Sequence, residues 1–215
     1  HYPLHILLEL PTELDWFDSA EGTAEEEFYP NSNWDVMRQL TEYFKIPVLE
    51  NEFFEIGLNK TMDGKVSGTF GGSADGDSFD FHLNTVLTDD ACYFTFPARS
   101  WEGTIIDTSL LPDGYGIFRM GYQPNRVDES GQEICDFDIE SLDMVYALDP
   151  SVYQECMYLS EDETQIYLLT QKDGVLHLTV IDVATMTSVQ ELEIIDFGEE
   201  RGGIYKIHQK DDYWV

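Results

Sequence analysis

The second half of the chain consists of strand-length segments separated by short polar turns, and this alternation constrains the fold more than any other feature. It is clearest in LSEDETQIYLLTQKDGVLHLTVIDVATMTSVQELEI, residues 159–194. Within it, residues 175–180 alternate between two sets of side chains, which is the period of a β-strand. Three turn signals, SEDE, KDG and DVATM, divide the segment. The pattern predicts four strands in a row.

A similar pattern precedes this segment, which predicts an internal repeat. The two copies align at two different offsets, because the connection 123–132 is longer than its counterpart around 171–174. Insertions of this kind are accommodated in surface loops. At an offset of 49, residues 109–120 match 158–169 through Asp113/Asp162, Ile117/Ile166, Phe118/Tyr167 and Met120/Leu169. At an offset of 44, residues 137–148 match 181–192 through Asp138/Asp182, Ile139/Val183, Ser141/Thr185, Leu142/Met186, Val145/Val189 and Leu148/Leu192.

The paired Asp and Ser/Thr residues fall where such a unit would turn between its last two strands. Asp138 and Asp182, with Ser141 and Thr185, can accept hydrogen bonds from local backbone amides. We interpret them as turn-forming residues rather than as a catalytic pair.

Two partial copies extend the pattern. Residues 85–96, TVLTDDACYFTF, look like the turn and second strand of an earlier unit, and residues 205–215 look like the opening of a later one. One four-stranded sheet cannot bury both faces alone, so we expect neighbouring units to stack.

The unit resembles a blade of a β-propeller, of the WD-like and YVTN-like bacterial type, over about residues 80–215. In such repeats the turns often read S-P-D-G, D-G and D-x-x-T-G; SLLPDG, KDG and DVATM take these places here. Met186 replaces the last glycine, and no Trp-Asp pair ends a blade. A closed propeller needs at least four blades, and the region holds about three at this period. The resemblance therefore implies a truncated chain, completion by oligomerisation or an open stack.

Residues 1–79 form a different region. Alternating apolar residues predict a strand over 2–10, and the spacing of apolar residues predicts a helix over 33–46, capped by Asn33 and ended by Pro47. A hairpin is expected over 52–71, with its turn at Asp63-Gly64. The fold class is mainly β, with propeller-like four-stranded antiparallel blades after an N-terminal segment that carries one helix.

The charge balance narrows the range of partners. The chain has 43 acidic and 11 basic residues in 215, a net charge of −32. Such a surface repels nucleic-acid phosphates and anionic membranes, and no apolar run approaches the length of a membrane span. Cations and basic proteins remain suitable partners. Acidity that serves only solubility is the alternative interpretation.

The sequence allows more than one cellular location and more than one state of the cysteines. The chain begins without Met, and we expect an extracytoplasmic or secreted location, with an anchor outside this segment; the cytoplasm is the alternative. Cys135 and Cys156 would be the most plausible bridged pair in an exported protein. Buried free thiols at Cys92, Cys135 and Cys156 are the favoured state.

Two groups of residues are candidate sites. Asp75, Asp77 and Asp80 in GGSADGDSFDF would suit Ca²⁺, because closely spaced oxygen ligands on a glycine-rich loop are what this ion requires; a solvated turn is the alternative. No other cofactor is expected. The second group, Trp16, Trp34 and Trp101, would bind a carbohydrate or a cation, or would simply pack on a sheet.

Three functions follow from these features. The leading prediction is a non-enzymatic binding or interaction module for a protein or glycan, since no nucleophile elbow, metal-binding helix motif or phosphate loop is present. The first alternative is a propeller-type, metal-assisted hydrolase or lyase acting on glycans. The second is an acidic cytosolic inhibitor of a basic protein.

Overall fold

The described part of the chain is mainly β, with one α-helix. A computed structural model describes residues 34–49, 52–60, 66–74, 77–98, 106–123, 126–127, 133–134, 137–198, 209–210 and 213–214. The chain divides into two units, residues 1–32 and 33–215, and every described residue lies in the second. All strand pairs in the described part are antiparallel.

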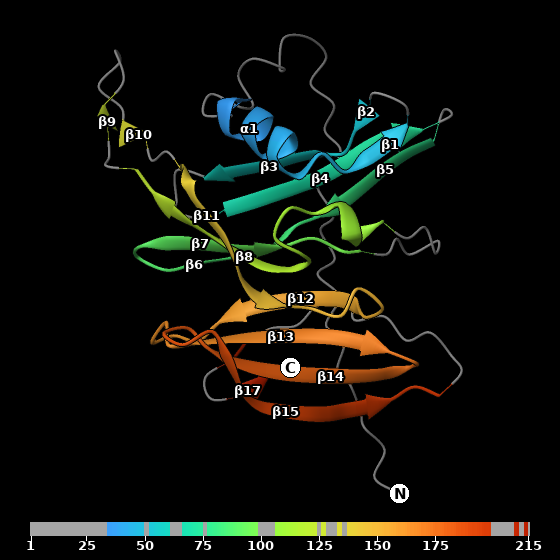
Figure 1. Ribbon diagram of the computed structural model, residues 1–215. Helices are drawn as coiled ribbons and strands as arrows, with labels where there is room; N and C mark the ends of the chain where they lie inside the picture. The colour runs from blue at the N-terminus through green and yellow to red at the C-terminus, as the bar shows by residue number, and fades with distance from the viewer. Residues whose placement is uncertain are drawn as a thin grey trace, which may run out of the picture. The chain divides into compact units, whose positions relative to one another are not determined.

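Three larger sheets follow one another along the chain (Figure 1). The first sheet contains β3 (Glu55–Lys60), β4 (Val66–Ala74) and β5 (Asp77–His82). The middle sheet contains β6 (Asn84–Leu87), β7 (Ala91–Thr95), β8 (Gly116–Tyr122) and β11 (Phe137–Ala147). The last sheet contains β12 (Tyr153–Leu159), β13 (Gln165–Lys172), β14 (Val175–Asp182) and β15 (Thr187–Asp196). In each, neighbouring strands follow in chain order.

Three short strand pairs and one helical turn complete the described elements. β1 (Pro47–Leu49) pairs with β2 (Glu52–Phe53), and β16 (Gln209–Lys210) pairs with β17 (Tyr213–Trp214). β9 (Arg126–Val127) and β10 (Glu133–Ile134) form a separate hairpin between β8 and β11. A 3₁₀ turn covers Thr108–Leu110.

The predicted helix is present but shorter than expected. α1 spans Trp34–Phe44, and Val36, Leu40 and Phe44 are buried at the four-residue spacing of one helix face. It ends two residues before the predicted boundary because Lys45 takes a positive φ of 46°, a left-handed conformation that stops a helix. Pro47 then opens β1. The expected cap at residue 33 lies outside the described residues.

The predicted hairpin is also present. β3 and β4 pair from Glu55 with Gly71 to Lys60 with Val66. The Asp63-Gly64 turn and the strand expected over 2–10 lie outside the described residues.

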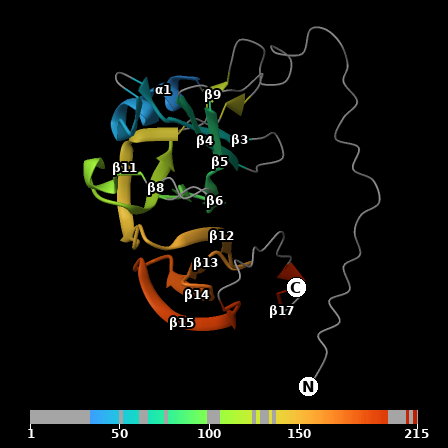
Figure 2. The ribbon, with the colours of Figure 1, turned by 90° about the vertical axis from the view of Figure 1, so that its right-hand side faces the viewer.

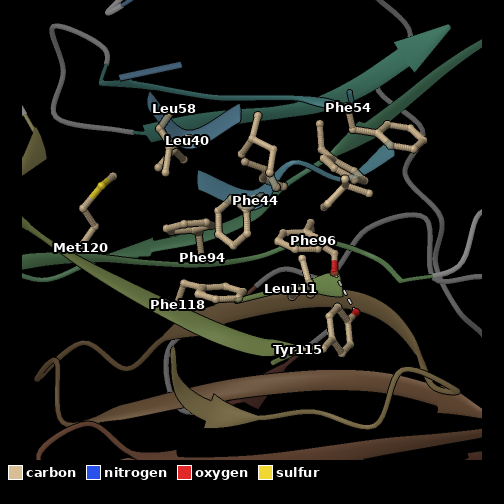
Figure 3. Close-up of a cluster of buried hydrophobic side chains, with 14 of the residues drawn as sticks. Leu40, Phe44, Phe54, Leu58, Phe94, Phe96, Leu111, Tyr115, Phe118 and Met120 are labelled. Atoms are coloured by element: carbon tan, nitrogen blue, oxygen red, sulfur yellow. Dashed lines mark hydrogen bonds between the residues drawn. The ribbon is translucent and has the colours of Figure 1, made fainter. Parts of the chain in front are cut away.

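An aromatic cluster joins α1 to the first and middle sheets (Figure 3). The Phe44 ring meets Phe96 and Phe118 edge to face, with ring centroids 5.3 and 4.8 Å apart. Phe96 also stacks on Phe70 of β4 at 5.0 Å. Close-packed rings at these angles contribute more than their buried area alone, so this cluster is the main core.

A second core lies on the opposite face of the middle sheet. In β7, Cys92 and Phe94 belong to the first core, whereas Ala91 and Tyr93 belong to the second. The second core contains Val86, Ala91, Tyr93 and Ile117 from the middle sheet, and Met157, Ile166, Leu168 and Ile181 from the last sheet. The middle sheet is therefore buried on both faces, which explains why all five residues of β7 are buried.

The last sheet agrees with the strand order predicted from residues 159–194, as seen from the side in Figure 2. Asp173 and Gly174 both take positive φ, 51° and 82°, which is the type I′ turn expected of an Asp-Gly hairpin. The amide and hydroxyl of Thr185 both donate to Asp182 Oδ1, at 2.8 and 2.7 Å. The prediction of turn chemistry at this pair is confirmed.

The strand equivalence proposed at an offset of 49 does not match the topology. β8 is third in the middle sheet, whereas β13 is second in the last sheet. β11 and β15 do hold the same fourth place, as the offset of 44 implies. Asp138 and Ser141 do not turn between two strands, however: they lie within β11, where the six residues 138–143 oppose the three residues 119–121 of β8.

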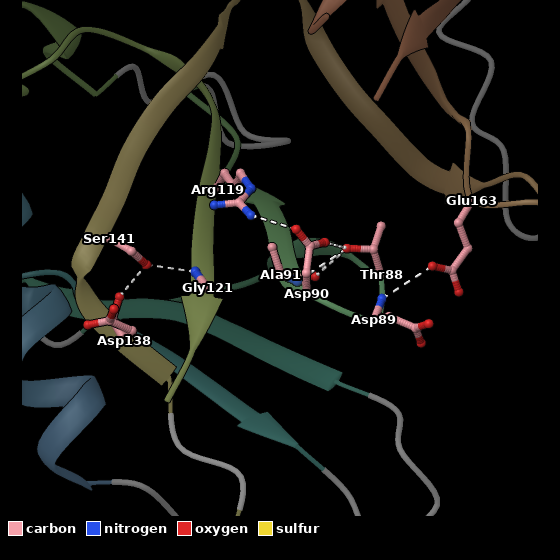
Figure 4. A network of polar contacts seen from close by, with 9 residues as sticks. All are labelled: Thr88, Asp89, Asp90, Ala91, Arg119, Gly121, Asp138, Ser141 and Glu163. Atoms are coloured by element: carbon pink, nitrogen blue, oxygen red, sulfur yellow. Dashed lines mark hydrogen bonds and ion pairs between the residues drawn. The ribbon is translucent and has the colours of Figure 1, made fainter. Parts of the chain in front are cut away.

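This part of β11 is a bulge held by the predicted residues. Ser141 Oγ donates to the Asp138 carbonyl at 2.7 Å and accepts from the Gly121 amide at 2.8 Å (Figure 4). Asp138 Oδ1 accepts from the Glu140 amide. Asp138 satisfies a local amide as predicted, whereas Ser141 accepts from an amide of the neighbouring strand β8. The connection through β9 and β10 replaces the turn, and these hydrogen bonds hold a bulge in the strand instead.

Candidate functional site

Two turns of the same design open the middle and last sheets. In the β6–β7 turn, Thr88 Oγ1 donates to Asp90 Oδ1 at 2.6 Å and accepts from the Ala91 amide. In the β12–β13 turn, Ser160 Oγ donates to Asp162 Oδ1 at 2.7 Å and accepts from the Gln165 amide. Both turns use a hydroxyl to orient a carboxylate and to satisfy a backbone amide. They are structural equivalents.

The two turns meet. The Asp89 amide donates to Glu163 Oε2 at 3.2 Å, which joins residues 74 positions apart (Figure 4). Glu163 takes a positive φ of 57°. The left-handed backbone at this position helps the turn to fold back on itself. The tips of the first hairpins of the middle and last sheets are thus held side by side.

One cation lies beside this pair of turns. Arg119 of β8 forms an ion pair with Asp90, Nη2 to Oδ2, at 2.8 Å. The Thr88 hydroxyl and then Arg119 lower the pKa of Asp90, because both favour its charged form. Burial opposes the charge of Arg119, but hydrogen bonds with Tyr93 and Asp90 raise its pKa. Asp90 is ionised and held in place at neutral pH.

The remaining carboxylates give the turns a strongly negative surface. Asp89, Asp90 and residues 161–164 are exposed. Hydrogen bonds from Ser160 and Thr164 lower the pKa of Asp162, so it stays charged. We name this surface, residues 88–91 and 160–165, the acidic turn pair. Opposite charges in a partner would be attracted to it, and rigid presentation would favour one orientation.

The predicted calcium ligands fall in and beside β5. Asp77 and Asp80 are paired in its ladder, with Ala74 and Gly71 of β4, while Asp75 lies outside the described residues. Within the described part of the chain, no group of three His, Cys, Asp or Glu side chains is arranged to hold a metal ion. The Ca²⁺ site stays a prediction.

The predicted aromatic site is likewise untested. Trp34 is the first residue of α1. Trp16 and Trp101 lie outside the described residues, so the aromatic site stays a prediction.

The described cysteines carry free thiols. Cys92 is buried and Cys156 is partly buried. Burial raises the pKa of Cys156 to about 11. A thiol with this pKa remains protonated at neutral pH and is a poor nucleophile.

Sequence reasoning missed the acidic turn pair. The signal was present: Thr88-x-Asp90 repeats as Ser160-x-Asp162, and each is followed by a β-strand with Tyr at its third position, Tyr93 and Tyr167. The sequence comparison treats residues 85–96 as a partial copy and aligns residues 158–169 with 109–120 instead. The contact between the two turns depends on sheet packing, which no sequence pattern reveals.

Searches against protein-family models, curated proteins and solved structures find no match to this chain. No helix in the described ranges has both the length and the apolar character needed to cross a membrane.

Proposed function

We propose that this chain is a non-enzymatic binding module, built on propeller-like blades, whose ligand is a protein with a positively charged surface. The middle and last sheets are the proposed blades. An inhibitor of a basic protein would be one form of such a module.

The observation that carries the proposal is the face-to-face packing of two successive four-stranded sheets through the second core. Each sheet runs in chain order and opens with the same hydroxyl–carboxylate turn. Blades of a propeller stack in this way, and repetition places equivalent loops on one rim. Such rims are suited to binding because the scaffold holds the loops rigidly.

Charge defines the kind of ligand. The acidic turn pair presents Asp89, Glu161 and Glu163, which form no ion pair among the described residues, while Arg119 pairs with Asp90. The whole chain carries a net charge of −32. A basic protein would therefore be steered to this surface and held there by several ion pairs.

The test is a titration with octalysine, a defined cationic probe, followed by calorimetry at low and physiological salt. Glu161→Gln combined with Glu163→Gln should weaken binding about threefold to tenfold, since two ion pairs are removed. The matched control is Glu140→Gln with Asp143→Asn, which removes the same charge from exposed positions of β11. If both variants weaken binding equally, the protein acts only as a diffuse polyanion, and the proposal fails.

A further inference from the structure

Strand β15 is exposed along its whole length. It is an edge of the last sheet and pairs, within the described part of the chain, only with β14. All ten of its residues are exposed. Its side chains include four of the six exposed large hydrophobics of the described residues: Val189, Leu192, Ile194 and Ile195, with exposed fractions between 43% and 57%.

An exposed apolar edge strand of this length is unusual in a stable protein. Unpaired amide and carbonyl groups along an edge offer a template for another strand, and proteins normally shorten, cover or bend such edges. Exposed apolar side chains that gather on one element indicate an interaction site rather than random scatter.

Two bulges determine where an added strand would fit. Val189 is the extra residue between the pairs Val180–Gln190 and Ile181–Ser188. Ile194 is the extra residue at the second register shift. Regular pairing with β14 runs from Gln190 to Glu193, so the free edge is straight there and bends at both ends.

The charges on β15 have one sign. Glu191 and Glu193 flank Leu192 in the straight segment, Asp196 ends the strand, and the strand contains no Lys, Arg or His. In a ladder, an added strand would place its side chains opposite these carboxylates and opposite Leu192. Lys or Arg at alternate positions, with apolar residues between them, would complement this edge.

A second copy of the chain complements it poorly. Pairing of β15 with itself would place Glu191 and Glu193 against the same residues of the other copy, and like charges opposite one another destabilise a ladder. Each copy also carries the full net charge of −32.

We propose that β15 is a docking strand for an extended segment of a partner protein in which basic and apolar residues alternate. The segment pairs with the free edge along Gln190–Glu193, and its basic side chains meet Glu191 and Glu193. Backbone hydrogen bonds supply affinity and the alternation supplies specificity. This inference rests on the proposed function and assigns it a second surface, separate from the acidic turn pair.

The experiment uses the whole chain and two blocked synthetic peptides, (Lys-Val)₄ and (Lys-Gly)₄. Both carry the same charge, but only the first favours a β-strand. We expect (Lys-Val)₄ to bind about tenfold more tightly, and hydrogen exchange to slow at the amides of residues 190–193. Equal affinity for the two peptides, or no added protection in β15, would overturn strand addition.

Variants separate the surfaces. Leu192→Ser with Ile195→Ser, and independently Glu191→Gln with Glu193→Gln, should each weaken (Lys-Val)₄ binding, while Glu140→Gln with Asp143→Asn should not. Because none of the substituted residues of β15 is buried, these variants should fold, and circular dichroism checks this. If (Lys-Val)₄ slowed hydrogen exchange only at the acidic turn pair, the proposed function would stand and this inference would be refuted. If the Glu161/Glu163 variant and its matched control bound octalysine equally, while (Lys-Val)₄ still slowed hydrogen exchange in β15, the acidic turn pair would be refuted as the binding surface. The docking strand would then stand. Self-association that Leu192→Ser abolishes would identify a second copy as the occupant and refute the inference.

Discussion

At the scale of single residues, one tyrosine hydroxyl is the centre of a buried group of hydrogen bonds. Tyr115 OH accepts from the Ala98 amide at 2.9 Å and donates to the Phe96 carbonyl at 2.8 Å. Gln154 Nε2 of β12 also donates to it. Burial raises the pKa of Tyr115, so the hydroxyl stays protonated. One oxygen thereby links the segment after β7 to the last sheet.

Replacing Tyr115 by Phe should destabilise the protein by about 2–3 kcal/mol. The ring would remain, but buried donors on Ala98 and Gln154 would lose their acceptor, and an unsatisfied buried group costs more than a hydrogen bond contributes. Urea unfolding measures the change. Tyr167→Phe is the control, because its partly buried hydroxyl donates to Gln165 at the sheet surface, and a cost below about 1 kcal/mol is expected. Equal losses in the two variants would contradict the role of Tyr115.

Asp149 should make stability depend on pH in acid. Hydrogen bonds from Ser151, followed by the ion pair with Lys172 at 3.0 Å, lower its pKa from 3.8 to about 2. The folded-state pKa is depressed, so the stabilisation is present above pH 3.8 and is lost as the pH falls towards 2.

Asp149→Asn, measured by urea unfolding from pH 7 to pH 2, tests this. The wild type should be more stable than the variant above about pH 4, and the difference should disappear near pH 2. A difference that stays constant over this range would show that the carboxylate charge contributes nothing.

At the scale of elements, turns and bulges determine the paths of the strands. The type I′ turn at Asp173-Gly174 closes the β13–β14 hairpin, and the Gly174 carbonyl accepts from the Phe197 amide at 2.8 Å. Gly198 follows, with a φ of 68°. The end of β15 therefore folds back over the hairpin turn, which requires a residue without a side chain at position 174.

Gly174→Ala should destabilise the last sheet by about 2 kcal/mol or more, because φ is 82° and a Cβ would lie 2.0 Å from the Gly198 carbonyl oxygen. Gly198→Ala is a matched control: φ is also positive, but a Cβ there would meet nothing within 4 Å. We expect it to cost about 1 kcal/mol, from conformation alone. Thermal unfolding of the two variants measures the difference, and the reverse order would refute the close approach.

At the scale of the whole molecule, two apolar cores oppose a large excess of negative charge. The middle sheet is buried on both faces and is joined by these cores to the first and last sheets. Ion pairs such as Arg119–Asp90 and Lys172–Asp149 are at least partly exposed, so each offsets little of the repulsion. The net charge of −32 favours solubility but works against the compact state.

Salt should therefore stabilise the protein. Raising NaCl from about 0.02 M to about 0.3 M shortens the screening length several-fold, and we expect the melting temperature to rise by several degrees. Differential scanning calorimetry measures this. Sucrose that matches the osmolality is the control for general solute effects. A melting temperature that is flat or falls with salt would show that attractive ion pairs outweigh the repulsion.

Sequence patterns predicted an element well where residues close in the sequence determine it. The helix at α1, the β3–β4 hairpin and the four strands of the last sheet follow from apolar spacing and turn residues such as Asp173-Gly174. The helix end at Lys45 was missed by two residues because one left-handed backbone angle, rather than Pro47, stops it. The sites were not predictable to the same extent: the contact between Asp89 and Glu163 joins distant turns.

The sequence by itself determined the strand-rich character, the helix α1, the excess charge and the turn chemistry of Asp182 with Thr185, because these depend on composition or on neighbours within a few residues. Only the tertiary structure decided which strands are equivalent, that Asp138 and Ser141 bend β11, that the two acidic turns meet and that β15 is left exposed. These properties depend on sheet order and on the burial of one face against another, and a chain brings such distant residues together only when its cores form.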